Sequence, residues 1–290
     1  MPELPEVETI ARGLAKRITG DVIESVWLGS KPEPLKSSAG QIARALEHSR
    51  ILAVRRMGKH IVFDLERNSV GAKRGRTQKN RTGGKSNEDE CLRTTQFIVH
   101  LGMTGRLQVC EPDAEVAKHT HATAKLASGQ ELRFVDPRRF GRLSVSASFD
   151  ADGVEPLEVG LEQFLALFRG RKTPIKSALL NQKLLRGVGN IYADESLFSA
   201  GIRPRRRAST IRRDQFAKLL DAVKEVLREA IMAGGSSVSD YVNADGNEGF
   251  FQLQHRVYGR EGEPCLVCGT PIKRVVIAGR SSHYCPHCQE

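Results

Sequence analysis

A helical stripe of apolar residues begins close to the N-terminus of the chain. It consists of Val7, Ile10, Leu14 and Ile18. Spacings of three and four residues place these side chains on one face of an α-helix. A proline in the first turn and a glycine after the last apolar position are typical helix boundaries. We therefore expect a helix from about residue 5 that fixes the position of the chain end.

The next part of the chain has the pattern of β-strands. Short runs rich in apolar and β-branched residues alternate with turn residues, and Ser128-Gly129 is typical of a hairpin turn. Eight runs of this kind predict an antiparallel β-sandwich. They are residues 22–28, 51–56, 60–65, 96–101, 105–110, 121–127, 131–135 and 141–145.

After about residue 153 the apolar spacing becomes helical. The last helical stretch carries Phe216, Leu219, Val223 and Leu227 on one face. The predicted helices cover 161–168, 174–185, 190–200 and 214–233. The fold class is therefore α+β, with an N-terminal domain over 1–152, a helical domain over 153–235, and a C-terminal region over 236–290.

Two stretches lack the apolar residues of a packed element. Residues 67–94 are rich in Gly, Lys, Arg, Asn, Thr and Ser, so burial cannot offset their ordering entropy. We expect a mobile insertion there, a solvated loop or, as an alternative, a supplementary DNA-contacting arm. Residues 235–251 are polar and contain glycines, which makes them a candidate for a loop that closes on a ligand.

The composition is that of a basic globular protein. The chain of 290 residues has 45 Lys and Arg against 34 Asp and Glu, a net charge of +11. A cationic surface of this size attracts polyanions such as nucleic acid or acidic membranes. The sequence has no run of eighteen apolar residues, and its start lacks the pattern of a signal peptide. We expect a soluble, cytoplasmic protein.

Four of the six cysteines form two C-x-x-C pairs near the C-terminus. Cys265 and Cys268 are separated by sixteen residues from Cys285 and Cys288. This spacing lets the two ends of a β-hairpin present four thiolates to one Zn²⁺ ion. A closed four-thiolate site leaves no open coordination position, so the predicted zinc is structural. Arg280, near the tip of the hairpin, is either a solvated turn residue or a phosphate contact.

A turn with two glycines joins two of the predicted helices. In this turn, residues 184–191 (LLRGVGNI), bare backbone N–H groups and a helix N-terminus can hold a phosphate. Asn190 is a plausible N-cap of the second helix. A plain helix connection fits the motif equally well, but Lys172, Lys176 and Lys183 nearby favour contact with a DNA backbone.

Pro2 becomes the chain terminus if the initiator methionine is removed, which its small size permits. A free α-amine has a pKa of about 8 and a lysine about 10.4, so the neutral, nucleophilic fraction at pH 7 is about a hundredfold larger at the terminus. A secondary amine that attacks C1′ of a nucleotide forms an iminium. The base leaves as the iminium forms, and this electron sink then permits elimination of the flanking phosphates.

These motifs together resemble the bacterial formamidopyrimidine-DNA glycosylases. The resemblance rests on residues 2–9 (PELPEVET), residues 187–193 (GVGNIYA) and the terminal cysteine hairpin, and it extends over the chain outside 67–94. It implies a β-sandwich domain, a helix-two-turn-helix domain and a β-hairpin zinc finger. It also implies that Pro2 is the Schiff-base nucleophile and that Glu3 protonates the opening sugar ring.

The resemblance assigns further roles position by position. Lys59 matches the lysine that assists elimination, and Arg280 the zinc-finger arginine that grips the phosphate beside the lesion. The positions that fill the gap left by an everted nucleotide, or contact DNA elsewhere, are Met103, Arg138, Phe140, His119, Arg171 and Asn190. Arg171 stands where the family often has lysine. His119 and His121 share one face of a strand, so a metal site there is a minor alternative.

The sequence therefore predicts a monomeric base-excision repair enzyme with one structural zinc. It would act on double-stranded DNA containing oxidised purines or abasic sites, as a glycosylase and AP lyase. One alternative is an endonuclease VIII-type enzyme specific for oxidised pyrimidines, against which Leu4 and residues 138–140 (RRF) argue by analogy. Another is a zinc-ribbon protein that binds DNA without catalysis, in which Pro2 and Glu3 would be idle.

Overall fold

The computed structural model describes residues 1–31, 33–67, 94–237, 244 and 249–290. The predicted insertion therefore lies outside the described residues except at its ends, as does most of 235–251. The helices are α1 (Leu4–Ile18), α2 (Ala39–Leu46), α4 (Leu161–Phe168), α5 (Ile175–Leu179), α6 (Asn190–Ser199) and α7 (Arg213–Met232), with 3-10 turns η1 (Ala208–Thr210) and η2 (Phe251–Gln254). The strands are β1 (Ile23–Leu28), β2 (Ser49–Met57), β3 (His60–Arg67), β4 (Thr94–His100), β5 (Arg106–Cys110), β6 (Thr120–Leu126), β7 (Glu131–Val135), β8 (Arg142–Ser146), β9 (Lys273–Ile277) and β10 (Arg280–Tyr284).

The β-rich part of the chain forms two four-stranded antiparallel sheets. Their strand orders are β2-β3-β4-β8 and β1-β6-β7-β5. Strands β4 and β5, and likewise β7 and β8, are consecutive in the chain but lie in different sheets. The loops between them therefore cross from one sheet to the other at the same end of the sandwich. The predicted α+β class with an antiparallel sandwich is confirmed.

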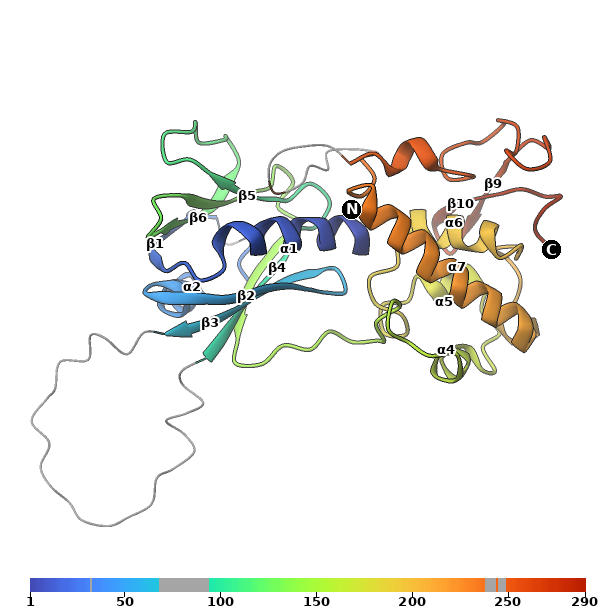
Figure 1. The fold of residues 1–290 in the computed structure, drawn as a ribbon, viewed down its shortest axis with the longest axis horizontal. Helices are drawn as coiled ribbons and strands as arrows, with labels where there is room; N and C mark the ends of the chain where they lie inside the picture. The colour runs from blue at the N-terminus through green and yellow to red at the C-terminus, as the bar shows by residue number, and fades with distance from the viewer. Residues whose placement is uncertain (32, 68–93, 238–243, 245–248) are drawn as a thin grey trace, which may run out of the picture.

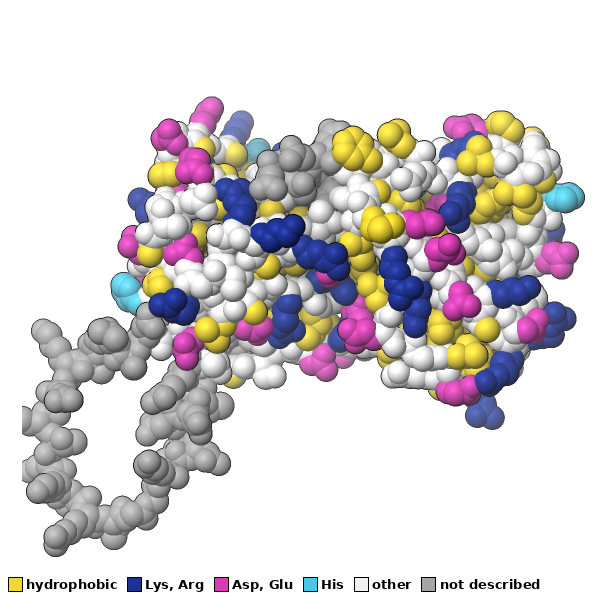
Figure 2. Space-filling model, viewed as in Figure 1, with side chains coloured by type: hydrophobic (Ala, Val, Ile, Leu, Met, Phe, Trp, Pro, Cys, Tyr) yellow, Lys and Arg dark blue, Asp and Glu magenta, His cyan; other side chains and the backbone are white. Residues whose placement is uncertain are grey.

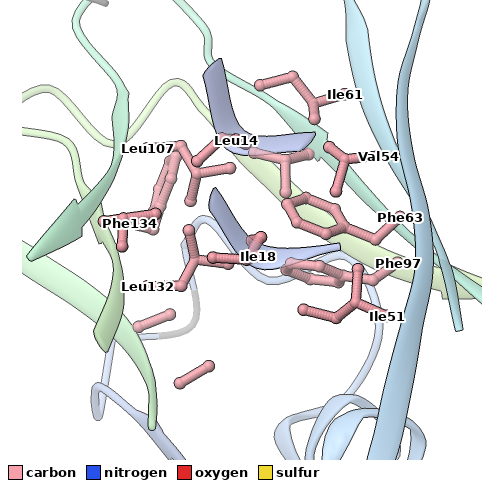
Figure 3. Packing of buried hydrophobic residues seen from close by; sticks show 14 of the residues in the cluster. Leu14, Ile18, Ile51, Val54, Ile61, Phe63, Phe97, Leu107, Leu132 and Phe134 are labelled. Carbon is pink, nitrogen blue, oxygen red and sulfur yellow. The ribbon is translucent and has the colours of Figure 1, made fainter. Parts of the chain in front are cut away.

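Helix α1 lies between the sheets, with its apolar stripe inside the main core (Figure 1). In Figure 3, Leu14 and Ile18 lie between Phe134 of one sheet and Phe63 of the other. All four residues are at most 1% exposed. Burying a side chain of this size contributes about 1.5–3 kcal/mol, so the stripe fixes the helix between the sheets. Its N-terminus consequently points toward the helical part of the chain.

Two helices differ from the sequence prediction. Helix α2 had no predicted counterpart, although Ser38 and Gln41 form a capping box at its start. The predicted helix over 174–185 is the short α5, which ends at Leu179. Beyond it, the Gln182 amide donates to the Leu180 and Val188 carbonyl oxygens and accepts from the Gly187 N–H. These side-chain bonds replace the backbone bonds that would have continued the helix.

The helical part packs around the long helix α7. Its core is separate from that of the sandwich and includes Phe164, Phe168 and Phe216, whose rings contact one another. Among the helices that the structure describes, none combines the length and apolarity that a bilayer span needs. Figure 2 shows Lys and Arg side chains across the middle of one face, where the sandwich meets the helices.

Candidate active site at the N-terminus

The start of the chain is anchored to the helical part of the molecule. The Leu4 N–H donates to the Gly187 carbonyl oxygen at 3.0 Å, and the Leu4 side chain is buried in the core around α7. Gly187 has a φ of +89°, and a Cβ at this position would lie 2.8 Å from Leu4 Cδ1. Only glycine fits both the backbone conformation and this close approach. The glycine turn therefore holds the N-terminus at the junction visible in Figure 1.

A cavity of about 660 Å³ opens at this junction. Pro2 and Glu3 from the chain start, Lys59 from the sandwich and Arg280 from the cysteine hairpin all line it. The structure thus brings together the four predicted catalytic residues from three distant parts of the sequence. Met103 and Asn190 line the same cavity.

The Glu3 carboxyl lies buried at the N-terminus of α6. Its Oε1 accepts the Ile191 N–H at 3.2 Å, whereas Oε2 has no hydrogen-bond partner among the described residues. Burial raises the pKa of Glu3 to about 7, against the opposing effect of the Lys59 ammonium. The N-cap of α6 is Gly189, not Asn190 as predicted. Position 189 has room only for glycine, because a Cβ there would lie 2.1 Å from the Glu3 carboxyl carbon.

Glu6, one turn further along α1, is a second buried carboxyl beside the cavity. It accepts hydrogen bonds from the Tyr192 hydroxyl, from the Glu3 N–H at 2.7 Å and from the Ser236 N–H at 2.9 Å. Burial raises the pKa of Glu6 as well. Glu6 therefore ties α1 to α6 and to the residues that follow α7. Glu6 was not among the predicted site residues, although the Glu3-x-x-Glu6 spacing is that of a capping box.

Lys59 lies in the two-residue turn between β2 and β3. Gly58, with a φ of +59°, packs against the Arg186 side chain of the glycine turn, and this contact directs the hairpin toward the helices. Lys59 is only 8% exposed. Burial lowers its pKa, while the carboxyls of Glu3 and Glu6 oppose the shift. An amine of this kind is more often neutral than a surface lysine and is better suited to accept a proton.

Arg280 is exposed and is the first residue of β10, directly after the Ala278-Gly279 turn of the hairpin. A buried ion pair beneath it holds the hairpin against the helices. Lys176 Nζ lies 2.6 Å from an Asp194 carboxylate oxygen and donates to the Ser281 carbonyl oxygen at 2.6 Å. Asp194 also accepts the N–H of His283. The hairpin therefore projects Arg280 into the cavity from a fixed base.

The cysteine hairpin fits a structural zinc ion. The Sγ atoms of Cys265, Cys268, Cys285 and Cys288 all lie within 4.8 Å of one another. The Cys265–Cys288 and Cys268–Cys285 pairs are 3.9 and 3.5 Å apart. A tetrahedral Zn²⁺ with Zn–S bonds of about 2.3 Å requires S···S distances of about 3.8 Å. Because four thiolates complete the coordination, such an ion would organise the hairpin and leave the chemistry to other groups.

The remaining predicted DNA contacts lie outside the cavity. Arg138 and Phe140 belong to the β7–β8 loop, where the guanidinium carbon lies 4.7 Å from the ring centre. His119 is exposed just before β6, and the exposed Arg171 donates to the Leu167 carbonyl oxygen. The alternative histidine metal site gains no support, since His121 donates to the Asp136 carbonyl oxygen. Within the described part of the chain, no potential metal cluster of three or more ligands includes either histidine.

Sequence reasoning missed the groups that position these residues. Tyr192 belongs to the motif 187–193 and Asp194 adjoins it, but each also bonds to a residue more than eighty positions away, Tyr192 to Glu6 and Asp194 to His283. Ser236 and Tyr258 line the cavity from segments without a recognisable motif. A buried lysine such as Lys176 has no signal in the sequence, where it reads as one more basic residue.

The arrangement defines a class of protein. It has a β-sandwich, a helical part with a cysteine hairpin, and a cavity at the N-terminus of the chain that is lined by ionisable side chains with shifted pKa values. Family models for the formamidopyrimidine-DNA glycosylase N-terminal domain, its H2TH domain and a zinc finger found in FPG and IleRS match residues 1–143, 153–242 and 262–290. The formamidopyrimidine-DNA glycosylase of Solibacter usitatus is 46% identical, with both chains fully covered.

Solved structures of this kind of enzyme are also similar to the chain over its whole length. Lactococcus lactis Fpg, in complex with DNA containing an abasic site, is 32% identical with a TM-score of 0.82, and 99% of each chain is covered. MutM in complex with DNA containing carbocyclic 8-oxo-G is 32% identical with a TM-score of 0.82, and both chains are fully covered. The chain belongs to the formamidopyrimidine-DNA glycosylase family, as the motifs predicted.

Proposed function

We propose that this protein is a bifunctional DNA glycosylase and AP lyase of base-excision repair. It removes oxidised purines, 8-oxoguanine and formamidopyrimidines, from double-stranded DNA and cleaves the strand at the resulting site. The observation that carries the proposal is the convergence of Pro2, Glu3, Lys59 and Arg280 on one cavity. Family membership and the relatives solved with abasic-site and 8-oxo-G DNA support the substrate class.

The reaction begins with the Pro2 nitrogen, which becomes a secondary amine once Met1 is removed. The amine attacks C1′ of the everted nucleotide, the C1′–N bond breaks, and the base leaves with the bonding electrons. The sugar ring then opens to an iminium that links Pro2 to the DNA. The iminium makes the C2′ proton acidic, so loss of this proton expels the 3′ phosphate, and a second elimination expels the 5′ phosphate.

Glu3 supplies the proton that the ring oxygen needs as the sugar opens. A carboxyl with a pKa of about 7 is still protonated in a large fraction of molecules at neutral pH, so it can act as a general acid there. A carboxyl of ordinary pKa would be almost fully ionised. Gly189 is part of this arrangement, because it leaves the space for the Glu3 carboxyl.

Lys59 and Arg280 act on the eliminations. Lys59, whose pKa is lowered by burial, accepts a proton during β-elimination. Arg280 binds the phosphate beside the lesion and assists the second elimination. Asn190 contacts the backbone from the start of α6, and His119 and Arg171 contact it elsewhere. Met103, Arg138 and Phe140 fill the gap that the everted nucleotide leaves.

Borohydride trapping tests the mechanism. The protein is incubated with duplex DNA bearing 8-oxoguanine, the iminium is reduced, and the adduct is digested and mapped by mass spectrometry. We expect the DNA fragment on the nitrogen of Pro2 in chains that lack Met1. An adduct on Lys59, or an active protein that retains Met1, would overturn the assignment of the nucleophile.

Two comparisons separate the alternatives. Duplexes bearing oxidised cytosine or thymine, run in parallel, distinguish the purine enzyme from an endonuclease VIII-type enzyme. Binding of 8-oxoguanine DNA without any trapped adduct would favour a non-catalytic zinc-ribbon protein. Glu3→Gln is expected to stop trapping on 8-oxoguanine duplexes but not on preformed abasic sites, whose sugar is already open in part.

The proposal extends to the organisation of the protein. We propose functional domains over 1–152, 153–235 and 236–290, a monomeric state, and a cytoplasmic location in which the protein is nucleoid-associated when bound to DNA. Analytical ultracentrifugation of the free protein and of its complex with one duplex tests the monomeric state. A dimer in either sample would contradict it.

A further inference from the structure

Two loops that cross between the sheets carry exposed apolar side chains. The Met103 loop (residues 101–105) connects β4 to β5, and the Phe140 loop (residues 136–141) connects β7 to β8. Met103 is 41% exposed and Phe140 is 51% exposed. Each loop joins the same two sheets, so the ends of both loops are fixed by the sandwich, while the side chains at their tips are exposed.

The buried carboxylate of Asp136 binds both loops. Its Oδ1 accepts the Thr104 hydroxyl of the Met103 loop at 2.6 Å. Within the Phe140 loop, Oδ1 also accepts the Arg138 N–H at 3.3 Å and Oδ2 accepts the Gly141 N–H at 2.7 Å. Asp136 is 0% exposed, so water does not compete for these bonds. One side chain thus connects the residue after Met103 to the residues on both sides of Phe140.

The backbones of the two loops are also in direct contact. Gly102 has a φ of +67°, and a Cβ at this position would lie 2.5 Å from the Phe140 carbonyl carbon. The Gly102 N–H donates to Nδ1 of His100 at 3.1 Å. Burial lowers the pKa of His100 to about 4, so its ring is neutral at pH 7 and can accept this bond. The Met103 loop is therefore fixed on one side by His100 and on the other by the Phe140 loop.

We propose that Asp136 and Thr104 are positioning residues that join the Met103 loop and the Phe140 loop into one rigid wedge. The two apolar side chains then enter the DNA together, without separate ordering of each loop. The inference rests on the proposed function, because a wedge is needed only if a nucleotide leaves the base stack. Filling that gap is what allows the everted state to persist long enough for attack by Pro2.

The chemistry of position 136 explains why a carboxylate is required. Both of its oxygens accept N–H or O–H donors, so every contact uses it as an acceptor. An asparagine would present an amide NH₂ group to one of these donors and repel it. Asp136→Asn can therefore disturb the fold of the loops as a whole. Thr104→Val removes only the hydroxyl, which donates to Asp136 Oδ1 at 2.6 Å and accepts the Arg138 N–H at 3.4 Å, and it keeps the shape of the side chain.

Thr104→Val is the test, with two substrates that differ in their need for a wedge. One is an 8-oxoguanine duplex, in which the nucleotide must leave the stack. The other is a single-stranded oligonucleotide with a preformed abasic site, which has no base pair to disrupt. We expect Thr104→Val to reduce the rate of borohydride trapping at least tenfold on the duplex and less than twofold on the single strand.

Two controls isolate the bond between the loops. Thr104→Ser keeps the hydroxyl and should restore the wild-type ratio of the two rates. Thr95→Val removes a threonine hydroxyl that bonds to the Ser146 carbonyl oxygen in the same sandwich, remote from either loop, and should leave both rates unchanged. A double-mutant cycle of Met103→Ala and Phe140→Ala should be strongly non-additive in the wild-type background and nearly additive in Thr104→Val.

The possible results distinguish a failure of the wedge inference from a failure of the proposed function. Equal trapping by Thr104→Val and wild type on the duplex, or equal losses on both substrates, would overturn the wedge inference but leave the proposed function intact. Additive effects of the two alanine variants in the wild-type background would overturn it as well. Wild-type protein that traps on neither substrate would instead refute the proposed function, and the inference with it.

Discussion

Glu3→Gln is expected to stabilise the protein above pH 7 while it abolishes excision of 8-oxoguanine. Burial raises the pKa of Glu3 from 4.5 to about 7, so above pH 7 the native state holds a buried negative charge. The native protein binds the proton of the Glu3 carboxyl more tightly than the unfolded chain does. The stability associated with the protonated carboxyl is therefore complete below pH 4.5 and is lost as the pH rises through 7.

The size of the effect follows from the shift. A rise from 4.5 to about 7 corresponds to a loss of about 3 kcal/mol between these pH values, since each pKa unit is worth about 1.4 kcal/mol. Glutamine avoids this loss because it carries no charge. Its oxygen can still accept the Ile191 N–H, and its NH₂ group replaces Oε2, which accepts no hydrogen bond from the part of the chain that the structure describes.

Urea unfolding measures this prediction directly. The single tryptophan, Trp27, lies in β1 and reports on the sandwich to which α1 belongs. At pH 8.5 Glu3→Gln should raise the free energy of unfolding by about 3 kcal/mol, and at pH 5 by less than about 1 kcal/mol. Glu24→Gln, which removes an exposed carboxyl from the same domain, controls for net charge. A gain that is the same at both pH values would refute the reasoning.

Three further outcomes are expected. Gly189→Ala should reduce excision of 8-oxoguanine as much as Glu3→Gln does, because the new Cβ overlaps the Glu3 carboxyl. Gly160→Ala should leave excision unchanged, because a Cβ at that position meets no described atom within 4 Å. Single-turnover kinetics compare the two variants, and a fully active Gly189→Ala would contradict the role of this glycine. Lys176→Met should lower the free energy of unfolding by about 3–5 kcal/mol because it removes the lysine that pairs with the buried Asp194 carboxylate. The double variant Lys176→Met/Asp194→Leu should recover most of this loss. A double variant no more stable than the single one in urea would contradict the prediction. Chelation of zinc should unfold the cysteine hairpin and abolish DNA binding, measured by fluorescence anisotropy, and affinity retained after complete loss of the metal would contradict the assignment of Arg280.

The sequence alone determined features that depend on local spacing. The stripe on α1 predicted the helix, and the alternation of apolar runs predicted the sandwich, because amphipathic periods reflect which face is buried. The paired cysteines predicted zinc, since ligand spacing within one hairpin is set by the chain itself. The motif at residues 2–9 singled out Pro2 and Glu3 through its resemblance to the family. The helix predicted over 174–185 was too long, because the bonds of the Gln182 side chain that end it at Leu179 do not affect the apolar spacing.

Only the tertiary structure decided the pKa values and the side-chain positions on which the proposed reaction depends. The pKa of Glu3 depends on burial against Gly189 and on the start of α6, nearly two hundred residues away along the chain. The position of Arg280 depends on the Lys176–Asp194 pair, and the bond from Thr104 to Asp136 joins two loops. These contacts leave no pattern in the sequence because electrostatic and hydrogen-bond energies depend on distance in space, whereas sequence periodicity records only distance along the chain.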